Sequence, residues 1–309
     1  MPTPKLSRKK HRKILDLAAE GASLREIGRK AGVAHGTGVK YAKLPLPEPA
    51  DPTAALPGSW AEDYPPFALE TPARVLVLSD VHIPFHVPKA LEAAVEYGRK
   101  NGADTVLLNG DVCDFHTISR YDHDGSKLTY TEEVEAGRQF LRYLRGKFPK
   151  ARIVFKEGNH DERLAKYILG RAPALFGLDN CTLPSLLGLA AAGVEHVGEQ
   201  RVVHAGKLRV IHGHEYGSGT SAPVNAARWL MLRARKPAMC GHLHQTSEQI
   251  EMDIDGNQLA AWSLGCLCGL NPRYRRLSTR WNHGCALVDV ARDGTFAVEN
   301  KRVMNGKVM

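Results

Sequence analysis

Acidic side chains, histidines and one asparagine gather in five short segments of this 309-residue chain. Carboxylate, imidazole and amide oxygen ligands together suit Mn²⁺, Fe²⁺ or Zn²⁺ better than Ca²⁺. One carboxylate can also lie between two such ions about 3.5–4 Å apart. A single segment of this kind is common in loops, but five in order predict a two-metal site. The segments are Asp80-Val81-His82, Gly110-Asp111-Val112-Cys113-Asp114, Gly158-Asn159-His160-Asp161, His212-Gly213-His214 and Gly241-His242-Leu243-His244.

The first three polar segments each follow a short apolar run, which positions them. Strands are expected over residues 75–79, 105–108 and 153–155, and helices over 88–100 and 131–148. Strands that alternate with helices form parallel sheets with right-handed crossovers. Ligands of such sheets bind beyond the carboxyl ends of the strands. The polar segments should therefore converge at one sheet edge.

The later part of the chain reads as antiparallel hairpins. Turn-forming pairs interrupt apolar segments at Ala205-Gly206, Asp255-Gly256 and Asp293-Gly294. Such pairs favour tight connections between neighbouring antiparallel strands. We expect hairpins over residues 201–211, 250–264 and 286–298.

The order D-x-H, G-D-x-x-D, G-N-H-D, H and G-H-x-H resembles the calcineurin-like metallophosphoesterase superfamily, over about residues 74–298. The stretches L-S-D-V-H-I-P-F-H, G-N-H-D-E-R and W-N-H-G are similar to a group common in bacteria and their phages. This resemblance implies an α/β fold, an αββα two-sheet sandwich with a dimetal site at one edge. Here a small all-α domain is expected to precede it.

The resemblance also implies a role for each polar residue. Asp111 would bridge two divalent transition-metal ions, with Mn²⁺ expected and Fe²⁺ or Zn²⁺ open. His160 would protonate the leaving group or stabilise the transition state, and Asp114 would orient His160. His214 is left without a ligand role, because the family position directly follows the strand. One metal would be held by Asp80, His82 and His244, and the other by Asn159, His212 and His242.

The two cations would neutralise charge on the phosphoryl oxygens and lower the pKa of a water between them. The resulting hydroxide would attack phosphorus in line. The same metals serve diesterases and monoesterases, so the motifs leave the substrate open.

The positive charge of the chain is concentrated at its N-terminus. The formal net charge is +9, and residues 1–44 hold 11 Lys and Arg against 3 Asp and Glu. Residues 45–72 hold none against 5, and the remainder holds 31 against 25. A small, strongly basic element indicates an anionic partner, most often nucleic acid, and the alternative is a solvated basic tail.

The basic segment contains the signals of short helices. Ser7 can cap a helix that runs to about Glu20, Ser23 and Glu26 form a capping box, and a third helix is expected over residues 36–44. The run R-E-I-G-R-K-A-G-V-x-x-x-T resembles helix-turn-helix segments, except that Gly38 stands where they usually carry Val or Ile. An ordinary helical hairpin is the alternative. DNA contacts would come from Arg8, Lys9, Lys10, Arg12, His35, Thr37 and Lys40.

Prolines mark the boundary between the basic segment and the rest of the chain. Residues 45–72 contain eight of the 18 prolines, so they cannot form a helix or a central strand. Trp60, Tyr64 and Phe67 are expected to pin the second half of this segment onto the next domain. The sequence thus predicts a helix-turn-helix module over 1–44, an acidic linker over 45–72 and a dimetal phosphoesterase domain over 73–309.

Further basic residues are predicted substrate contacts. Arg120 and Arg163 closely follow metal segments, and Arg273 and Arg276 belong to a basic, aromatic patch over residues 273–281. Such interleaving suits a nucleic-acid backbone and stacked bases. Surface salt bridges or a solvated loop are the alternatives.

The sequence favours a metal-dependent phosphodiesterase, with DNA as the expected substrate and the basic module raising its local concentration. A phosphomonoesterase or a small-molecule or cyclic-nucleotide phosphodiesterase is one alternative, and a DNA-binding regulator with an accessory phosphoesterase domain is another. No run approaches 18 apolar residues, and no apolar segment follows the basic N-terminus, so neither a membrane span nor a secretory signal is expected. Six scattered cysteines favour the reducing cytoplasm. A homodimer would match paired DNA half-sites.

Overall fold

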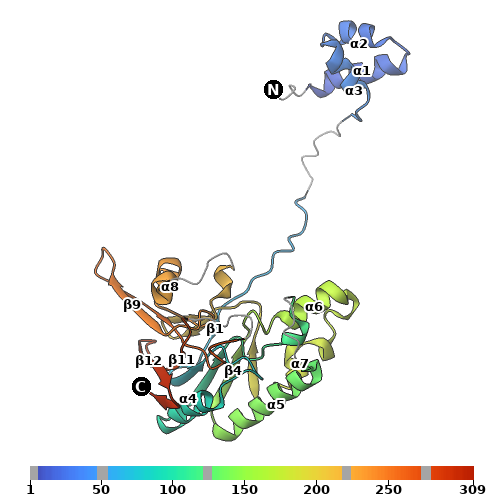
Figure 1. Ribbon diagram of the computed structural model, residues 1–309. Helices are drawn as coiled ribbons and strands as arrows, with labels where there is room; N and C mark the ends of the chain where they lie inside the picture. Colours follow the sequence, from blue (N-terminus) through green and yellow to red (C-terminus); the bar gives the residue numbers. More distant parts are fainter. Residues whose placement is uncertain (1–5, 47–54, 121–126, 218–223, 273–279) are drawn as a thin grey trace. The chain divides into compact units, whose positions relative to one another are not determined.

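The computed structural model describes residues 6–46, 55–120, 127–217, 224–272 and 280–309. The chain forms two compact units, Met1–Glu62 and Asp63–Met309 (Figure 1). Each unit has its own apolar core and is described separately below.

The N-terminal unit consists of three helices, α1 (Arg8–Ala19), α2 (Leu24–Ala31) and α3 (His35–Ala42). Ser7 caps α1, and the expected capping box between Ser23 and Glu26 begins α2. The third helix begins and ends earlier than predicted, since it covers His35–Ala42 and not 36–44. The core of the unit is small and consists of Ile14, Leu17, Ile27 and Ala31.

Gly38 lies where α2 and α3 approach most closely. It is buried, and a Cβ added to it would lie 3.6 Å from the Cα of Gly28. This is an ordinary van der Waals distance, so a methyl group would fit at position 38.

Part of the proline-rich segment belongs to the larger unit. The two-residue strand β1 (Phe67–Ala68) pairs with β6 (Val203–Ala205) at the edge of a sheet, where proline neighbours are tolerated. Phe67 packs against an apolar core of the larger unit, as expected. Trp60 is 97% exposed and does not pack as expected. The structure thus places residues 63–72 in the larger unit rather than in a separate linker.

The larger unit contains a seven-stranded sheet with the order β13-β12-β11-β2-β3-β4-β5. Strands β2 to β5 are parallel to one another, and β11 pairs antiparallel with β2. The three predicted strands and both predicted helices are present, with ends shifted by at most a few residues. The strands are β2 (Ala73–Leu78), β3 (Thr105–Asn109), β4 (Arg152–Lys156), β5 (Val194–Val197), β11 (His283–Val290), β12 (Phe296–Met304) and β13 (Lys307–Val308).

The second sheet has six strands in the order β1-β6-β7-β8-β10-β9. The predicted hairpins are confirmed as the antiparallel pairs β6–β7, β9–β10 and β11–β12. The short strand β8 was not predicted, and it runs parallel to both β7 and β10. Besides β1, the strands of this sheet are β6 (Val203–Ala205), β7 (Leu208–Ile211), β8 (Ala238–Cys240), β9 (Ser247–Met252) and β10 (Gln258–Ser263).

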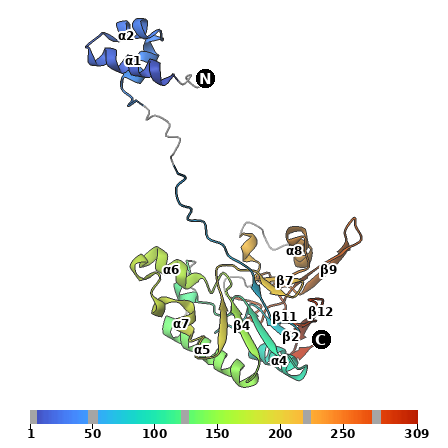
Figure 2. The same cartoon turned by 180° about the vertical axis from the view of Figure 1, so that it is seen from behind.

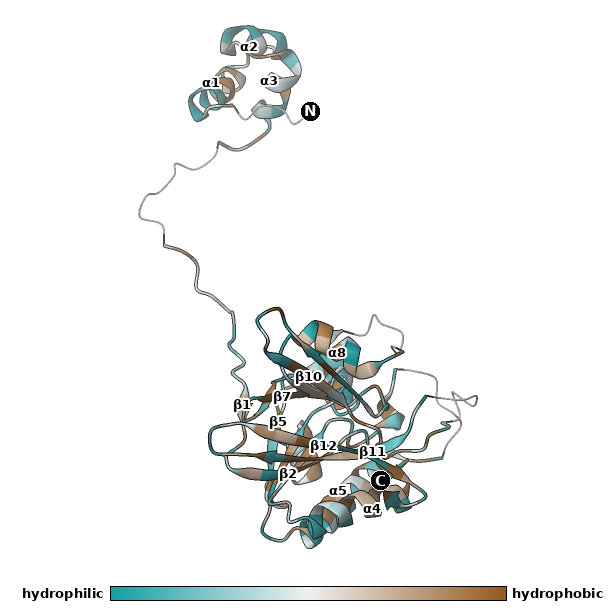
Figure 3. Ribbon diagram, turned by 90° about the vertical axis from the view of Figure 1, so that its left-hand side faces the viewer, coloured by the Kyte–Doolittle hydropathy of each residue, from teal (hydrophilic) through white to brown (hydrophobic). Residues whose placement is uncertain are grey.

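The two sheets pack face to face between helices. α4 (Pro88–Lys100) and α5 (Tyr130–Lys147) cover the outer face of the seven-stranded sheet, and α8 (Ala226–Ala234) covers the other sheet (Figures 2 and 3). Helices α6 (Arg163–Arg171) and α7 (Leu183–Leu187) follow β4. This arrangement is the αββα sandwich that the family resemblance implied.

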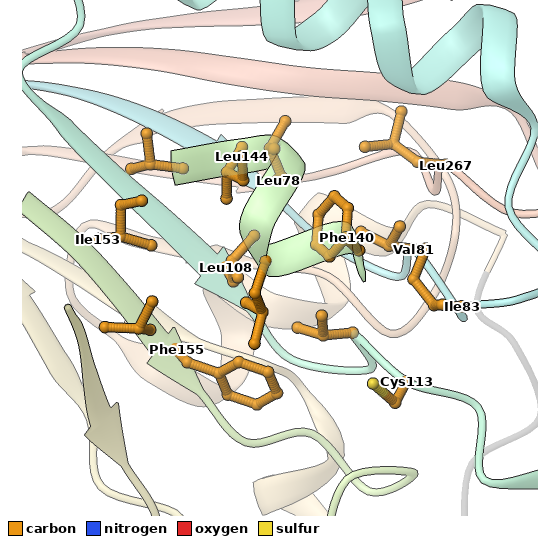
Figure 4. Close-up of a cluster of buried hydrophobic side chains, with 14 of the residues drawn as sticks. Leu78, Val81, Ile83, Leu108, Cys113, Phe140, Leu144, Ile153, Phe155 and Leu267 are labelled. Carbon is orange, nitrogen blue, oxygen red and sulfur yellow. The ribbon is translucent and has the colours of Figure 1, made fainter. Parts of the chain in front are cut away.

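Three apolar cores hold these layers together. The largest lies under α4 and α5 and includes Leu78, Leu108, Phe140 and Phe155 (Figure 4). A second fills the space between the sheets, and a third lies under α8. In the parts of the chain that the structure describes, we find no helix with the length and apolar character needed to cross a membrane.

Candidate metal centre

The predicted metal segments meet where the strands of the two sheets end. Asp80 follows β2, Asp111 follows β3, Asn159 follows β4, His212 directly follows β7, and His242 follows β8. Because parallel neighbouring strands end at the same edge, residues far apart in the chain come together here.

In the described residues, four groups of three side chains have ligand atoms close enough together to hold a metal ion, and two of these groups include Asp111. The possible ligand atoms of Asp80, His82 and Asp111 lie within 4.8 Å of one another, and so do those of Asp111, His212 and His242. Asp111 is common to both groups, as a bridging ligand must be. His244 joins the first group, since its Nε2 lies 3.0 Å from Asp80 Oδ1.

Three predicted ligand atoms have no hydrogen-bond partner although they are buried. They are His82 Nε2, His212 Nε2 and Asn159 Oδ1. A buried polar atom without a partner costs about 1–3 kcal/mol, so native proteins rarely leave one unsatisfied. Divalent cations would satisfy all three atoms at once, and the mixture of carboxylate, imidazole and amide oxygen fits transition-metal ions.

Hydrogen bonds on the far side of each ring direct the free nitrogen toward the centre. His212 Nδ1 lies 2.8 Å from the carbonyl oxygen of Asn109, to which it donates, so Nε2 points toward the centre. His82 Nδ1 lies 2.8 Å from Asp114 Oδ2 in the same way. Such outer partners fix the tautomer of a metal-binding histidine.

The backbone at this edge is strained. Left-handed φ angles of 50–62° occur at five predicted ligands, where L-residues other than glycine are uncommon. Each such residue costs on the order of 1–3 kcal/mol and persists only where the surroundings fix it, commonly at functional sites. The five are Asp80, His82, Asp111, His242 and His244.

Close packing explains two of the glycines in the motifs. A Cβ on Gly241 would overlap Ser79 Oγ, and a Cβ on Gly158 would overlap the backbone nitrogen of Asp111. Side chains at these positions would push the loops apart. The glycines therefore allow the ligand loops to approach each other.

The carboxylates strongly affect the buried histidines. Burial would lower the pKa of His212, but the charges of Asp111 and Asp80 outweigh it and raise this pKa to about 10. Burial and then Asp80 act in the same way on His244, whose pKa is also raised to about 10. At His242, burial and the neighbouring His212 lower the pKa to about 4. The charges of Asp80 and Asp111 thus favour positive charge in their surroundings.

His160 lies beside the metal-ligand groups and is held by Asp114. Its Nδ1 lies 3.3 Å from Asp114 Oδ2, as predicted, and its Nε2 lies 3.9 Å from Asp111 Oδ2. Asp114 also contacts His82, so this carboxylate supports a ligand as well as the predicted acid. Burial opposes its ionisation, but the hydrogen bonds from His160 and His82 prevail and lower the pKa of Asp114.

Arg163, a predicted substrate contact, lies against His160 and Asp114. Its Nη1 donates to the backbone and side-chain oxygens of Asp114, and its Nη2 lies 3.1 Å from His160 Nε2. A guanidinium can only donate, so Nε2 accepts this bond. Arg163 therefore helps to orient His160 in this structure.

Asp161 is a supporting residue whose role the sequence did not indicate. It is buried, and its carboxylate accepts hydrogen bonds from the backbone N–H groups of Gly158, Cys113 and Val112. It thereby joins the second and third metal segments. Burial and the charge of Asp111 raise the pKa of Asp161 to about 8. The position of Asp161 at the end of the G-N-H-D motif was the one signal in the sequence that pointed to it.

Two acidic residues support the fourth metal segment. Glu215 accepts from the backbone N–H groups of His212 and Gly213 and forms an ion pair with the fully buried Lys156 at 2.9 Å. Glu162 lies 2.9 Å from His214 Nε2. The ring centroid of His214 lies 5.3 Å from that of the predicted ligand His212.

Cys268 lies beside the predicted metal ligands. Its Sγ is 3.9 Å from His244 Nδ1. Together with His82 and His244 it forms a further group that could hold a metal ion. No spacing signal in the sequence links residue 268 to residue 244.

The remaining predicted contacts lie elsewhere. Arg120 is exposed and lies just beyond the loop that carries Asp114. Arg273 and Arg276 fall outside the described residues. In the N-terminal unit, Thr37 is partly buried, and the other predicted DNA contacts are exposed at the surfaces of α1 and α3: Arg8, Lys9, Lys10, Arg12, His35 and Lys40.

Residues 73–245 match the calcineurin-like phosphoesterase family, and this range contains all the predicted metal ligands. The chain belongs to this family. A gene 54 protein of Mycobacterium phage L5 is 30% identical over 229 residues, which cover 70% of this chain and 89% of the relative. The gene 54 protein of Mycobacterium phage D29 shows the same identity and coverage. This member of the family is a metal-dependent phosphoesterase.

Solved structures with distant similarity were also found. A zinc complex of Vps29 from Entamoeba histolytica is 16% identical, with a TM-score of 0.40, and covers 76% of this chain and 96% of its own. A dimetal phosphatase from Danio rerio is 12% identical, with a TM-score of 0.35, and covers 75% of this chain and 96% of its own.

Proposed function

We propose that this phosphoesterase hydrolyses phosphodiester bonds in DNA and that its N-terminal unit binds DNA. The observation that carries the DNA assignment is the charge of that unit. Residues 1–44 hold 11 basic against 3 acidic residues on three short helices with exposed basic side chains. Such a compact basic surface suits the phosphate backbone of nucleic acid.

Each part of the centre has a role in this reaction. Bound divalent ions, proposed to be Mn²⁺ and held by the two groups that share Asp111, would neutralise phosphoryl charge and activate a water. His160, held by Asp114 and Arg163, faces the same space and would act on the leaving oxygen. The loops after β2, β3 and β4 hold these side chains in place.

The N-terminal unit would hold the enzyme on its substrate. Thr37 and Lys40 lie three residues apart on α3 and so share a helix face, and Arg8 and Arg12, four residues apart, share a face of α1. We propose that α3 enters the major groove and α1 contacts phosphates. The six cysteines are unpaired, which suits the reducing cytoplasm where DNA is available.

A substrate comparison tests the proposal directly. In Mn²⁺, the enzyme should hydrolyse bis-p-nitrophenyl phosphate faster than p-nitrophenyl phosphate, and it should cleave DNA. Replacing Lys40 and Arg8 by Ala should weaken DNA binding but leave hydrolysis of the small diester unchanged. Arg142, an exposed arginine on α5, supplies the matched control as Arg142→Ala. Faster hydrolysis of the monoester without DNA cleavage would contradict the proposal.

A further inference from the structure

Trp281 lies directly against a predicted metal ligand. Its ring centroid is 4.1 Å from that of His244, with the two planes inclined at 58°. Two other tryptophans, Trp229 and Trp262, are buried in the cores, and Trp60 is 97% exposed. Trp281 alone among the four tryptophans combines contact with the metal centre and partial exposure.

The neighbours of Trp281 hold it in place. The backbone N–H of Asn282 donates to the carbonyl oxygen of His244 at 2.9 Å. The Asn282 side chain exchanges two hydrogen bonds with Thr246, at 2.6 Å and 2.9 Å. His283 Nε2 lies 2.9 Å from the carbonyl oxygen of Cys268. The indole is therefore fixed to the loop that carries His242 and His244.

The position of the ring indicates what it can contact. If a phosphodiester binds at the metal centre, the nucleoside attached to its phosphate lies next to the side chains that surround the centre. Trp281 is in contact with one of these side chains, His244. The preceding residue, Arg280, is exposed and positively charged. A flat aromatic ring with a nearby cation suits a nucleobase, since every base offers a π face for stacking.

We propose that Trp281 forms a base-stacking subsite that binds the nucleobase adjacent to the scissile phosphate. This inference rests on the proposed action on DNA and deepens it. A base within an intact duplex already stacks on its neighbours, so the subsite selects unpaired nucleotides. The enzyme should therefore cleave single-stranded DNA in preference to duplex DNA.

Two small substrates isolate the contribution of the base. A thymidine dinucleotide contains one phosphodiester bond, and an otherwise identical dimer without bases lacks the stacking groups. Trp281→Leu keeps apolar volume against His244 but removes the flat ring, and it should lower kcat/KM for the dinucleotide about tenfold. The same variant should change kcat/KM for the abasic dimer less than about twofold. Trp281→Phe should restore most of the lost activity.

The control is Tyr167→Ala, which removes an exposed aromatic ring on α6 and should alter neither substrate. Metal content is measured for each variant because Trp281 contacts a predicted ligand. An equal loss on both dimers, or no loss on either, would overturn the subsite.

A binding measurement separates this inference from the proposed function. Thymidine 5′-monophosphate should quench tryptophan fluorescence in the metal-loaded wild type but not in Trp281→Phe, and 2-deoxyribose 5-phosphate should quench neither. Quenching without cleavage of DNA would support the subsite and contradict the nuclease proposal. Cleavage of DNA with no quenching, at an unchanged rate in Trp281→Leu, would contradict the subsite alone.

Discussion

In the larger unit, Asp80, Asp111 and His212 are at most 2% exposed, and each contacts several charged groups. In the N-terminal unit, Lys9, Lys10 and Lys40 lie exposed on short helices. Buried charges must be paired or bind metal, so removing one disturbs all its partners. Exposed charges are screened by water and salt, so each one contributes only a little to DNA binding. Single substitutions should therefore have large effects at the centre and small, additive effects on the helices.

The largest effect is expected from Asp111→Asn. Asp111 belongs to both metal groups, and the amide can neither bridge two cations nor offset their charge. Without the metal ions, the transition state loses several kcal/mol of stabilisation, which should reduce turnover on the order of a thousandfold or more. Hydrolysis of a diester under saturating Mn²⁺ measures it, with circular dichroism to verify folding. Full metal-dependent activity in this variant would contradict the expectation that single substitutions at the centre have larger effects than those on the N-terminal helices.

A smaller loss is expected from His160→Gln. His160 lies beside the metal groups and is proposed to act on the leaving group rather than to bind metal, so metal content should stay at the wild-type value. The loss of kcat should be on the order of 10²–10⁴-fold, the usual contribution of a positioned acid or base. Steady-state kinetics combined with metal analysis separates the two quantities. If His160→Gln instead loses its metal, this residue is a ligand.

Metal binding should depend on pH. His212 and His244, with pKa values raised to about 10, are protonated near neutral pH in the metal-free protein. Metal ligands must be neutral, so binding releases protons, and affinity should fall as the pH decreases from about 8 to about 6. Calorimetry in buffers with different ionisation enthalpies measures the proton release. An affinity that does not change over this range would show that these histidines are not ligands.

The smallest effect is expected from Lys40→Ala in the N-terminal unit. Removal of one phosphate contact should weaken DNA binding modestly and reduce the slope of log K against log salt by about 1. Fluorescence anisotropy over a range of salt concentrations measures this slope. Arg142→Ala should leave the slope unchanged. Equal effects of both variants would mean that binding does not depend on the N-terminal helices.

The sequence predicted the residues that belong to local motifs. Asp80, Asp111 and His212 follow apolar runs, and the rule that parallel strands end at one edge places them together. The capping box of α2 and the three hairpins were likewise predictable because their signals lie within a few residues of each other.

Contacts between distant segments could not be predicted. The contact of Trp281 with His244, and the ion pair between Lys156 and Glu215, depend on how the two sheets pack. Arg163 follows a motif closely enough to be noticed, but only the fold reveals that it contacts His160 and Asp114. Packing geometry is set by many apolar contacts together, and no local pattern encodes it.

The central claim is that two metal ions share Asp111. Metal analysis of the wild type and of Asp111→Asn after removal of free Mn²⁺ tests it most directly. Two ions per chain are expected in the wild type and fewer than two in the variant, because Asp111 belongs to both of the groups that would hold them. A wild type that binds a single ion, or a variant that keeps two, would contradict the account.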